Sequence, residues 1–442
     1  MAKIVPFAAC RYNPARVKLQ DVVTQPYDKI TPAMQAGYYA RSPFNLIRVE
    51  KGRAEAGDTA ESNVYTRAAQ TLEDWIAKGI LVQDPSPAVY AYLQEYESPL
   101  TGERKLRKSF IALGRLEDYS AGIVFRHERT LAAPKADRLE LLRHTRTQTG
   151  QLFMLYDDPS GRLDTLLERF SRMPTSYEAA DEFGVIHRLW PIVDRETIDH
   201  IVAFMADKKL VIADGHHRYE TALAFREECR AALAQPSPNA PHEFAMMTFV
   251  NLRSDGLTIL PTHRVVFGLP HFDFAGFRKR VQPYFDCYAY PFVNSSEQAS
   301  AEQQFRRDVF QPTRRNAIGA YAGSAFYLFL LRGNASLEHW IADASPAQRQ
   351  LDVVLLHRLI LEKGLDISTE AVTEERHIRY EREVKAAVGA VDRGEAQIAF
   401  LLRPLGVTQV AEMALAGEVL PQKSTDFYPK LLSGLTLYRM ER

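Results

Sequence analysis

Residues 214–218, Asp-Gly-His-His-Arg, combine the side-chain types best suited to holding a phosphate group. The apolar run 210–213 before them predicts a short buried strand, Asp214-Gly215 predicts a tight turn, and the residues from His217 onward favour a helix. A strand–turn–helix corner directs free backbone N–H groups and the positive end of the helix dipole to one point, where an anion is stabilised. The sequence therefore predicts a phosphate site, with these members: Asp214, Gly215, His216, His217 and Arg218.

Two of these residues have a specific use in such a site. Gly215 lets the backbone approach a ligand closely, and Arg218 can bind phosphate through two parallel hydrogen bonds. The same letters also describe an ordinary turn, in which Asp214 caps the helix and the two histidines are polar surface. Spacing alone leaves both interpretations open.

A second group of polar residues begins at His127-Glu128, where Glu128 is a candidate general base and His127 a candidate catalytic partner. The following residues, 135–147, predict a strongly charged helix. On it Lys135, Arg138 and Arg146 share one broad face. That face is either a surface for phosphates or a solvated face with ion pairs to acidic neighbours.

Two further segments carry candidate residues. Thr262, His263 and Arg264 interrupt an apolar strand, so they either form cross-strand hydrogen bonds or line a phosphate-binding pocket. A polar loop near the C-terminus could reach the same site, and the sequence leaves this open. The loop contains Lys423, Ser424, Thr425 and Lys430.

The histidines also raise the alternative of a metal centre. The chain has no His-Glu-x-x-His motif and no paired cysteines, so no residue is predicted as a metal ligand. Magnesium on bound phosphates needs only a carboxylate or two, which Asp214 or Glu128 would supply. The chain also lacks a Walker-type glycine loop, a Gly-x-Gly-x-x-Gly signature and a nucleophile elbow.

Composition narrows the class of protein. The chain has 442 residues, and Lys+Arg and Asp+Glu both number 55, so the formal net charge is zero. A neutral chain is not expected to bind nucleic acid by bulk charge. Three cysteines without framework spacing fit a reducing compartment, and no apolar run is long enough for a membrane span or a signal peptide. A cytoplasmic location is expected.

The hydrophobic pattern predicts an α+β protein. A strand is expected at 45–50, a helix at 60–79, a hairpin from 88–96 and 107–116, and another strand pair from 243–252 and 257–267. After about residue 270, helices at 299–310, 347–363, 382–392 and 407–415 flank strands at 325–331 and 397–402. We expect an N-terminal core at 1–268 with a β-rich insertion at about 85–160, and a smaller α+β domain at 269–442.

Taken together, the motifs resemble the bacterial family of domain of unknown function 1015. The matching blocks extend from Pro6-Phe7 to Lys430, and they include Pro26-Tyr27-Asp28, Ser42-Pro43-Phe44-Asn45, His127-Glu128-Arg129-Thr130, Asp214-Gly215-His216-His217-Arg218, Leu260-Pro261-Thr262-His263-Arg264 and Pro421-Gln422-Lys423-Ser424-Thr425. The family usually has a proline before its His-Glu pair, where this chain has Arg126.

A more distant resemblance concerns residues 214–218 alone, which are similar to the phosphate-binding motif of the ParB and sulfiredoxin superfamily. That resemblance implies a mixed-sheet ParB/sulfiredoxin-like core, in which the glycine turn and helix start hold nucleotide phosphates. The superfamily includes nucleotide hydrolases and a kinase acting on free serine. His216 stands where sulfiredoxins have their cysteine nucleophile, so reductase chemistry is not implied.

The resulting hypothesis is a nucleotide-dependent phosphotransferase acting on a small hydroxylated metabolite, with free serine as the named example. Its partners would be a nucleoside di- or triphosphate with Mg²⁺ and the acceptor, and a homo-oligomer is compatible with the sequence. Asp28 or Glu128 would accept the hydroxyl proton, and His216 would assist. The alternatives are a nucleotide-gated binding module with weak hydrolysis and a metal-dependent hydrolase.

Overall fold

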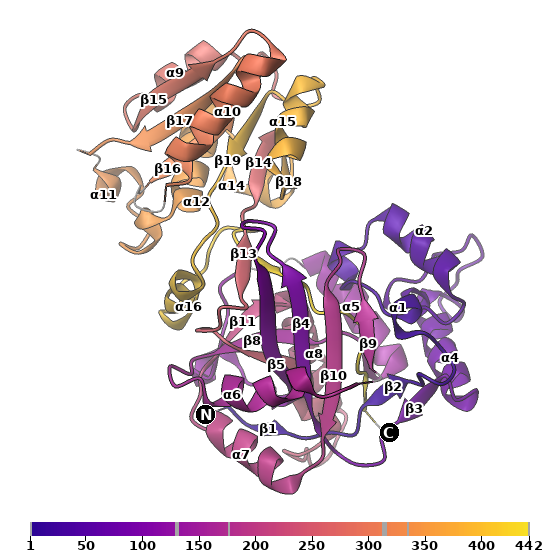
Figure 1. Ribbon diagram of the computed structural model, residues 1–442. Helices are drawn as coiled ribbons and strands as arrows, with labels where there is room; N and C mark the ends of the chain where they lie inside the picture. The colour runs from indigo at the N-terminus through magenta and orange to yellow at the C-terminus, as the bar shows by residue number, and fades with distance from the viewer. Residues whose placement is uncertain (1, 129–131, 176, 312–315, 334–335, 441–442) are drawn as a thin grey trace. The chain divides into compact units, whose positions relative to one another are not determined.

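The computed structural model describes residues 2–128, 132–175, 177–311, 316–333 and 336–440. The chain forms two compact units, of which unit 1 comprises Met1–Thr258 with Phe427–Arg442 and unit 2 comprises Ile259–Asp426. Both units mix helices and sheet (Figure 1), which confirms the predicted α+β class. The last residues of the chain, expected with the C-terminal part, belong to unit 1.

Unit 1 is built on a nine-stranded mixed sheet in the order β6-β11-β8-β12-β5-β4-β10-β9, with β1 paired to β5. The pairs β11–β6 and β12–β8 are parallel, and the other neighbours are antiparallel. Its strands are β1 (Ile4–Val5), β4 (Val89–Glu97), β5 (Arg104–Arg115), β6 (Val124–Phe125), β8 (Leu152–Tyr156), β9 (Glu178–Ala180), β10 (Ile186–Ile192), β11 (Leu210–Asp214) and β12 (Phe244–Asn251). The segment expected as an insertion thus supplies β4, β5 and β8 to the middle of this sheet.

The helices of unit 1 are α1 (Leu19–Val22), α2 (Pro32–Arg41), α3 (Ile47–Glu50), α4 (Val64–Ala77), α5 (Ala132–Thr145), α6 (Arg162–Glu168), α7 (Arg195–Met205) and α8 (His216–Ala231). Three of them, α4, α5 and α8, correspond to the helices predicted at 60–79, at 135–147 and from His217 onward. Two short pairs complete the unit, β2 (Cys10–Tyr12) with β3 (Leu81–Gln83) and β7 (Thr147–Gln148) with β21 (Tyr438–Arg439).

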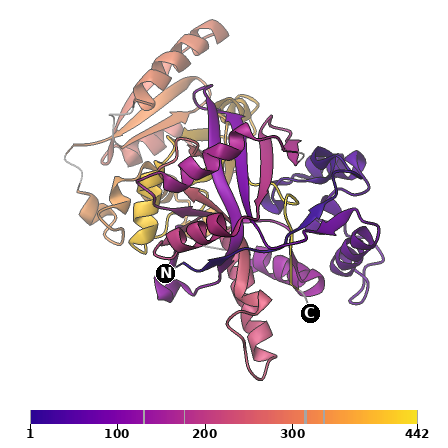
Figure 2. The same ribbon diagram turned by 60° about the horizontal axis from the view of Figure 1, so that its bottom comes forward.

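The two faces of the large sheet differ in chemistry. One face carries the apolar core, in which residues of β4, β5, β8 and β12 pack with α6, α7 and α8. Figures 1 and 2 both show α6 lying across this sheet. The other face carries buried polar side chains, among them Gln94, Arg107 and Gln151, which hydrogen bond to the backbone of residues 429–432. Buried polar groups need such partners, so the C-terminal segment is part of the core of unit 1.

Unit 2 contains a six-stranded antiparallel sheet in the order β15-β17-β16-β19-β14-β18. The strands are β14 (His263–Val266), β15 (Phe285–Pro291), β16 (Ala317–Tyr321), β17 (Ala325–Leu331), β18 (Ile378–Glu381) and β19 (Ile398–Leu401). Residues of α10 (Ser295–Val309) and α15 (Val384–Asp392) pack in one apolar cluster with the sheet. Phe277 of α9 (Phe274–Val281) packs against Phe329 and Phe400 of the sheet.

The other helices of unit 2 are α11 (Leu337–Trp340), α12 (Asp352–Leu355), the π-helix η6 (Leu356–Glu362), α13 (Lys363–Leu365), α14 (Thr369–Thr373) and α16 (Val407–Leu415). They lie between β17 and β18 in the chain, except for α16, which follows β19. None of the described helices of either unit has the length and apolar character needed to cross a membrane.

Two local predictions are wrong. The expected strand at 45–50 is instead the short helix α3, whose Ile47 N–H donates to Asn45 Oδ1 at 3.0 Å, and an asparagine that binds nearby backbone favours a turn over a strand. The strands at 243–252 and 257–267 do not pair with each other. Both edges of β12 are already occupied by β5 and β8, so the second segment contributes β14 to the other sheet.

Candidate functional site

The predicted corner forms at the end of β11. Ile212 pairs with Met154 and Asp214 pairs with Phe153, so Ala213 is one extra residue in the strand. Such a bulge turns the next side chain to the other face of the sheet, and it places Asp214 on the same face as Phe153. Gly215 follows with φ of 97°, in the left-handed region, and α8 begins at His216. The local structure is the strand, glycine turn and helix that the sequence predicts.

Asp214 is surrounded by positive charge. Lys430 Nζ lies 2.7 Å from its Oδ2, and Arg218 Nη2 lies 3.8 Å from its Oδ1. Burial by itself would raise the pKa of this carboxyl, but Lys430, Arg218 and Lys29 together hold it well below its usual range. Asp214 is therefore ionised throughout the neutral pH range.

Lys430 is held in place by the polar face of the sheet. Arg107 Nη2 donates to Pro429 O at 2.6 Å, and Gln94 Nε2 donates to Lys430 O at 2.8 Å. Arg107 Nε also donates to Gln94 Oε1 at 2.9 Å, which joins the two side chains. Burial lowers the pKa of Arg107 to about 10, although the nearby Asp214 acts in the opposite direction. This buried network fixes the backbone from which Lys430 reaches Asp214.

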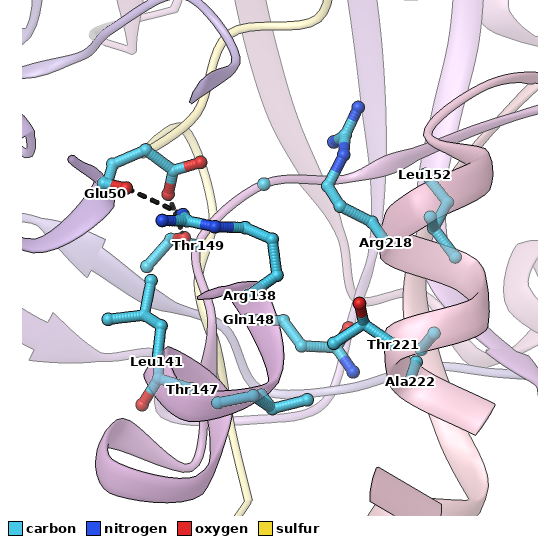
Figure 3. Close-up of a pocket in the computed structure, with 13 residues that line it drawn as sticks. Glu50, Arg138, Leu141, Thr147, Gln148, Thr149, Leu152, Arg218, Thr221 and Ala222 are labelled. Carbon is cyan, nitrogen blue, oxygen red and sulfur yellow. Dashed lines mark hydrogen bonds between the residues drawn. The ribbon is translucent and has the colours of Figure 1, made fainter. Parts of the chain in front are cut away.

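A cavity of about 60 Å³ lies beside this corner. Its walls come from the end of α3, from α5, from residues 147–152 and from the first turns of α8 (Figure 3). Arg138 extends from α5 and donates to Glu50 O at 2.7 Å, while Arg218 extends from the other side and donates to Gln151 O. Thr149 donates to the buried carboxylate of Glu50. By this measure the cavity holds only a few water-sized groups.

Two glycines let the cavity wall close around Arg218. A Cβ on Gly150 would lie 3.2 Å from Arg218 Nη1 and 2.9 Å from Ser433 Oγ. A Cβ on Gly215 would lie 3.2 Å from the guanidinium carbon of Arg218 and 3.1 Å from Leu152 Cδ2. All four distances are shorter than ordinary carbon contacts, so the position of Arg218 depends on the absence of side chains at these two positions.

The Pro-Tyr-Asp block lies near the same charges. The guanidinium of Arg138 stacks over the Tyr27 ring at 4.5 Å. Burial, together with the charge of Asp28, raises the pKa of Tyr27 to about 12, although Arg218 and Arg138 act in the opposite direction. Asp28 is exposed on the short 3-10 helix Tyr27–Lys29, so a ligand can reach it.

The two histidines that the sequence analysis placed in the catalytic machinery are buried together. The rings of His127 and His216 meet edge to face with centroids 4.6 Å apart, and His127 Nδ1 donates to Ile212 O at 2.8 Å. His216 Nε2 lies 3.4 Å from the His127 backbone N–H, which donates to it. Burial lowers the pKa of His127 to about 4, and it lowers the pKa of His216 well below its usual range. Both rings are neutral at physiological pH, while His217 is half-buried.

The charged helix α5 is largely ion-paired. Lys135 Nζ lies 2.8 Å from Glu220 Oε2, and Arg143 binds both Glu140 and Glu228. Arg138 also binds Asp137, yet it is the one cation of α5 among the described residues that line the cavity. Glu128 is half-buried directly after His127, and the neighbouring Arg129 and Thr130 lie outside the described residues.

Thr262, His263 and Arg264 belong to unit 2, where all three are buried. Arg264 Nη1 donates to Thr262 O, and its Nη2 lies 3.2 Å from both Gln422 O and Lys423 O. His263 Nδ1 accepts from the Leu402 N–H at 3.2 Å, and burial lowers its pKa to about 3. In unit 2 the side chains of His263 and Arg264 bind backbone groups.

The C-terminal polar residues divide between the units. Lys423, Ser424 and Thr425 belong to unit 2, and Lys430 belongs to unit 1, where it joins the Asp214 corner. Sequence reasoning missed Lys29, Glu50, Gly150 and Arg107 as neighbours of this corner. Lys29 directly follows the Pro-Tyr-Asp block, so its position in the sequence could have marked it as a candidate site residue. Arg107 lies in a strand whose sequence has no feature that distinguishes it from other strands.

Within the described ranges, no group of three or more His, Cys, Asp or Glu side chains is arranged to hold a metal ion.

Comparison with known proteins assigns a family. The family model described as "Protein of unknown function (DUF1015)" matches residues 4–354. The chain belongs to this family. No curated protein matches the chain.

Solved structures give weaker similarities. A conserved hypothetical protein from Pyrococcus furiosus is 12% identical, with a TM-score of 0.34, covering 71% of this chain and 92% of that one. A free serine kinase in complex with AMP is 13% identical, with a TM-score of 0.34, covering 69% of this chain and 84% of that one. Scores of this size do not assign an activity to this chain.

Proposed function

We propose that this chain is a nucleotide-dependent phosphotransferase that acts on a small hydroxylated metabolite, with free serine as the first acceptor to test. The observation that supports the proposal is that Arg138 of α5 and Arg218 of α8 both line one cavity beside the glycine turn. Guanidinium groups match phosphate oxygens in pairs, and helix starts favour anions. The cavity would take no more than one phosphate group at its present size, and the rest of the nucleotide would extend out of it.

The proposed reaction needs three contributions from the protein. The acceptor hydroxyl oxygen forms a bond to the terminal phosphorus, and the bond from that phosphorus to the nucleotide oxygen breaks. The hydroxyl proton passes to the carboxylate of Asp28 or Glu128. Arg218 and Arg138, with Lys135 nearby on α5, offset the negative charge on the transferred group, which is the main task in phosphoryl transfer. The neutral pair His127–His216 would support the turn from within the protein.

Magnesium bound to the nucleotide phosphates is part of the proposal, and it would balance their charge. Hard cations prefer carboxylate oxygens, and the residues present fit this requirement. Asp214 is ionised. Lys430 Nζ lies 2.7 Å from its Oδ2 and Arg218 Nη2 lies 3.8 Å from its Oδ1, so binding of Mg²⁺ would require this carboxylate to exchange its longer contact, the one with Arg218. Glu128 is the second carboxylate that we propose for holding Mg²⁺.

Calorimetry with ATP and ADP, with and without Mg²⁺, tests the binding step. We expect Arg218→Ala and Arg138→Ala each to weaken nucleotide affinity at least tenfold. The matched control is Arg143→Ala, because Arg143 lies on the same helix as Arg138 and pairs only with acidic residues of the surface among its described ion pairs. Equal affinity in wild type and Arg218→Ala would remove the proposal.

Phosphorus NMR tests the transfer step, with serine and a panel of hydroxylated metabolites as acceptors. A new phosphomonoester signal that depends on the acceptor supports a phosphotransferase. Release of inorganic phosphate at the same rate with and without every acceptor would instead favour the nucleotide-gated binding module.

A further inference from the structure

We propose that unit 2 contains a second ligand site, a groove that binds a small organic anion with an apolar body. The groove lies around the start of α9 and is bordered by residues 269–273, 365–368 and 376–377. Its volume is about 790 Å³, which falls within the range of small-molecule pockets. All of its walls belong to unit 2, so the proposal is independent of the phosphotransferase site.

The backbone around the groove is unusual. Seven described non-glycine residues have positive φ, and three of them, His271, Asp366 and His377, line this groove with φ of 53°, 57° and 65°. Left-handed backbone at non-glycine residues is uncommon, and it concentrates where a site must hold side chains in a set direction. The loops that form the groove therefore hold their side chains at a conformational cost that ordinary connections avoid.

The floor of the groove is apolar. Leu269, Pro270 and Phe272 line it with side chains that are partly or fully exposed. Phe277, Leu365 and Ile367 also line it but are almost fully buried in the core of unit 2. A rigid apolar floor with polar groups at the rim is the usual composition of a small-molecule site. The ligand should therefore have an apolar body as well as a polar group.

The rim has an excess of groups that can carry positive charge. Arg280 and Arg376 line it together with the imidazoles of His271 and His377. Arg280 binds Asp366 at 2.7 Å and Arg376 binds Glu374 at 2.7 Å, but these side chains are 49–77% exposed. Exposed ion pairs contribute little free energy, so both guanidinium groups can exchange their partner for a ligand.

The second carboxylate of the rim is already committed to the backbone. Asp273 accepts hydrogen bonds from the N–H groups of Ala275 and Gly276 at 3.0 and 2.8 Å, and so caps α9. Asp366 and Glu374 then oppose one arginine each, both through exposed pairs. An anionic ligand, either a carboxylate or a phosphate, would replace these exposed partners, because a guanidinium binds such a group through two parallel hydrogen bonds.

The test is calorimetry on the full chain with phenyl phosphate and benzoate as probes, and with phenol as the uncharged control. We expect saturable binding of at least one anionic probe. Arg280→Glu and Arg376→Glu should each weaken it at least tenfold. Arg393→Glu is the matched control, because Arg393 is as exposed as Arg376 and forms a similar surface pair with Glu395. Binding should be unchanged in this control and in Arg218→Ala, which excludes the cavity of unit 1.

Each outcome decides the proposal. Preference for phenyl phosphate or for benzoate supports it and identifies the anionic group. No saturable binding of either probe, equal affinity in the two groove variants and wild type, or phenol binding as tightly as the anions would overturn it. Circular dichroism checks the fold of each variant, and Arg376→Gln replaces Arg376→Glu if the charge reversal unfolds unit 2.

Discussion

Lys430 and Asp214 form an ion pair of 2.7 Å although 216 positions separate them in the chain. The pair joins the end of β11 to the C-terminal segment, so the candidate site is complete only when the last residues of the chain have docked on unit 1. Both side chains are mostly buried, at 9% and 20% exposure. A buried pair of this kind is costly to break from one side, because the remaining charge loses its partner.

Lys430→Met should lower the free energy of unfolding by about 2–3 kcal/mol, somewhat less than for a fully buried pair, because Arg218 still faces Asp214. Urea denaturation measures the change. Lys208→Met is the control, since Lys208 pairs with the exposed Asp207 and should cost little. When Asp214→Asn is already present, Lys430→Met should lower the free energy of unfolding by less than it does in the wild type. Additive costs would show that the two residues are not coupled.

The same pair predicts a response to acid. The pKa of Asp214 is lower in the folded protein than in the unfolded chain, so the unfolded chain takes up the proton first. The stability that the pair contributes is therefore fully present above about pH 5, and it declines as the pH falls below the unfolded pKa of about 3.9. The difference in unfolding free energy between wild type and Asp214→Asn should shrink below about pH 4. A constant difference down to about pH 3 would contradict this assignment.

His127 predicts a second pH dependence, at higher pH. Its pKa of about 4 in the folded protein lies below the ordinary 6.5, so the unfolded chain binds a proton in this interval and the folded chain does not. Stability should therefore fall as the pH drops from about 6.5 to about 4, by about 3 kcal/mol from this residue. His127→Gln should reduce the slope of unfolding free energy against pH in this interval, by the amount that corresponds to about one proton bound on unfolding. His200→Gln, at an exposed position, should leave the slope unchanged. An unaltered slope in His127→Gln would show that His127 is protonated in the folded protein.

Gly215→Ala separates backbone strain from steric contact. The residue has φ of 97°, and a Cβ there would press on Leu152 and Arg218 at 3.1–3.2 Å. Gly122→Ala is the matched control, since Gly122 has φ of 65° and a Cβ there would meet nothing within 4 Å. We expect both variants to lose about 1–2 kcal/mol from left-handed backbone. Only Gly215→Ala should also weaken nucleotide affinity, because it displaces Arg218. Equal affinities in the two variants would contradict a ligand role for this turn.

Local patterns predicted the elements well. The strand 210–213, the turn at Gly215 and the helix after it are all present, as are the hairpin of β4 and β5 and the helix α15. These features depend on residues within a few positions of one another, through apolar periodicity, turn preference and helix propensity. The segment 45–50 failed because a side-chain hydrogen bond from Asn45 to the nearby backbone outweighed the alternating pattern.

The assembly of the site depends on contacts that no local pattern contains. The residues of the Asp-Gly-His-His-Arg block, their order and their corner geometry were determined by the sequence alone. Tertiary structure decided that a bulge turns Asp214 toward Lys430 and that His216 is buried against His127. It also decided that Lys135 forms an ion pair with Glu220. Burial and ion pairing depend on neighbours that lie far away along the chain. Burial and ion pairing in turn determine whether a histidine is charged and whether an arginine lines a cavity.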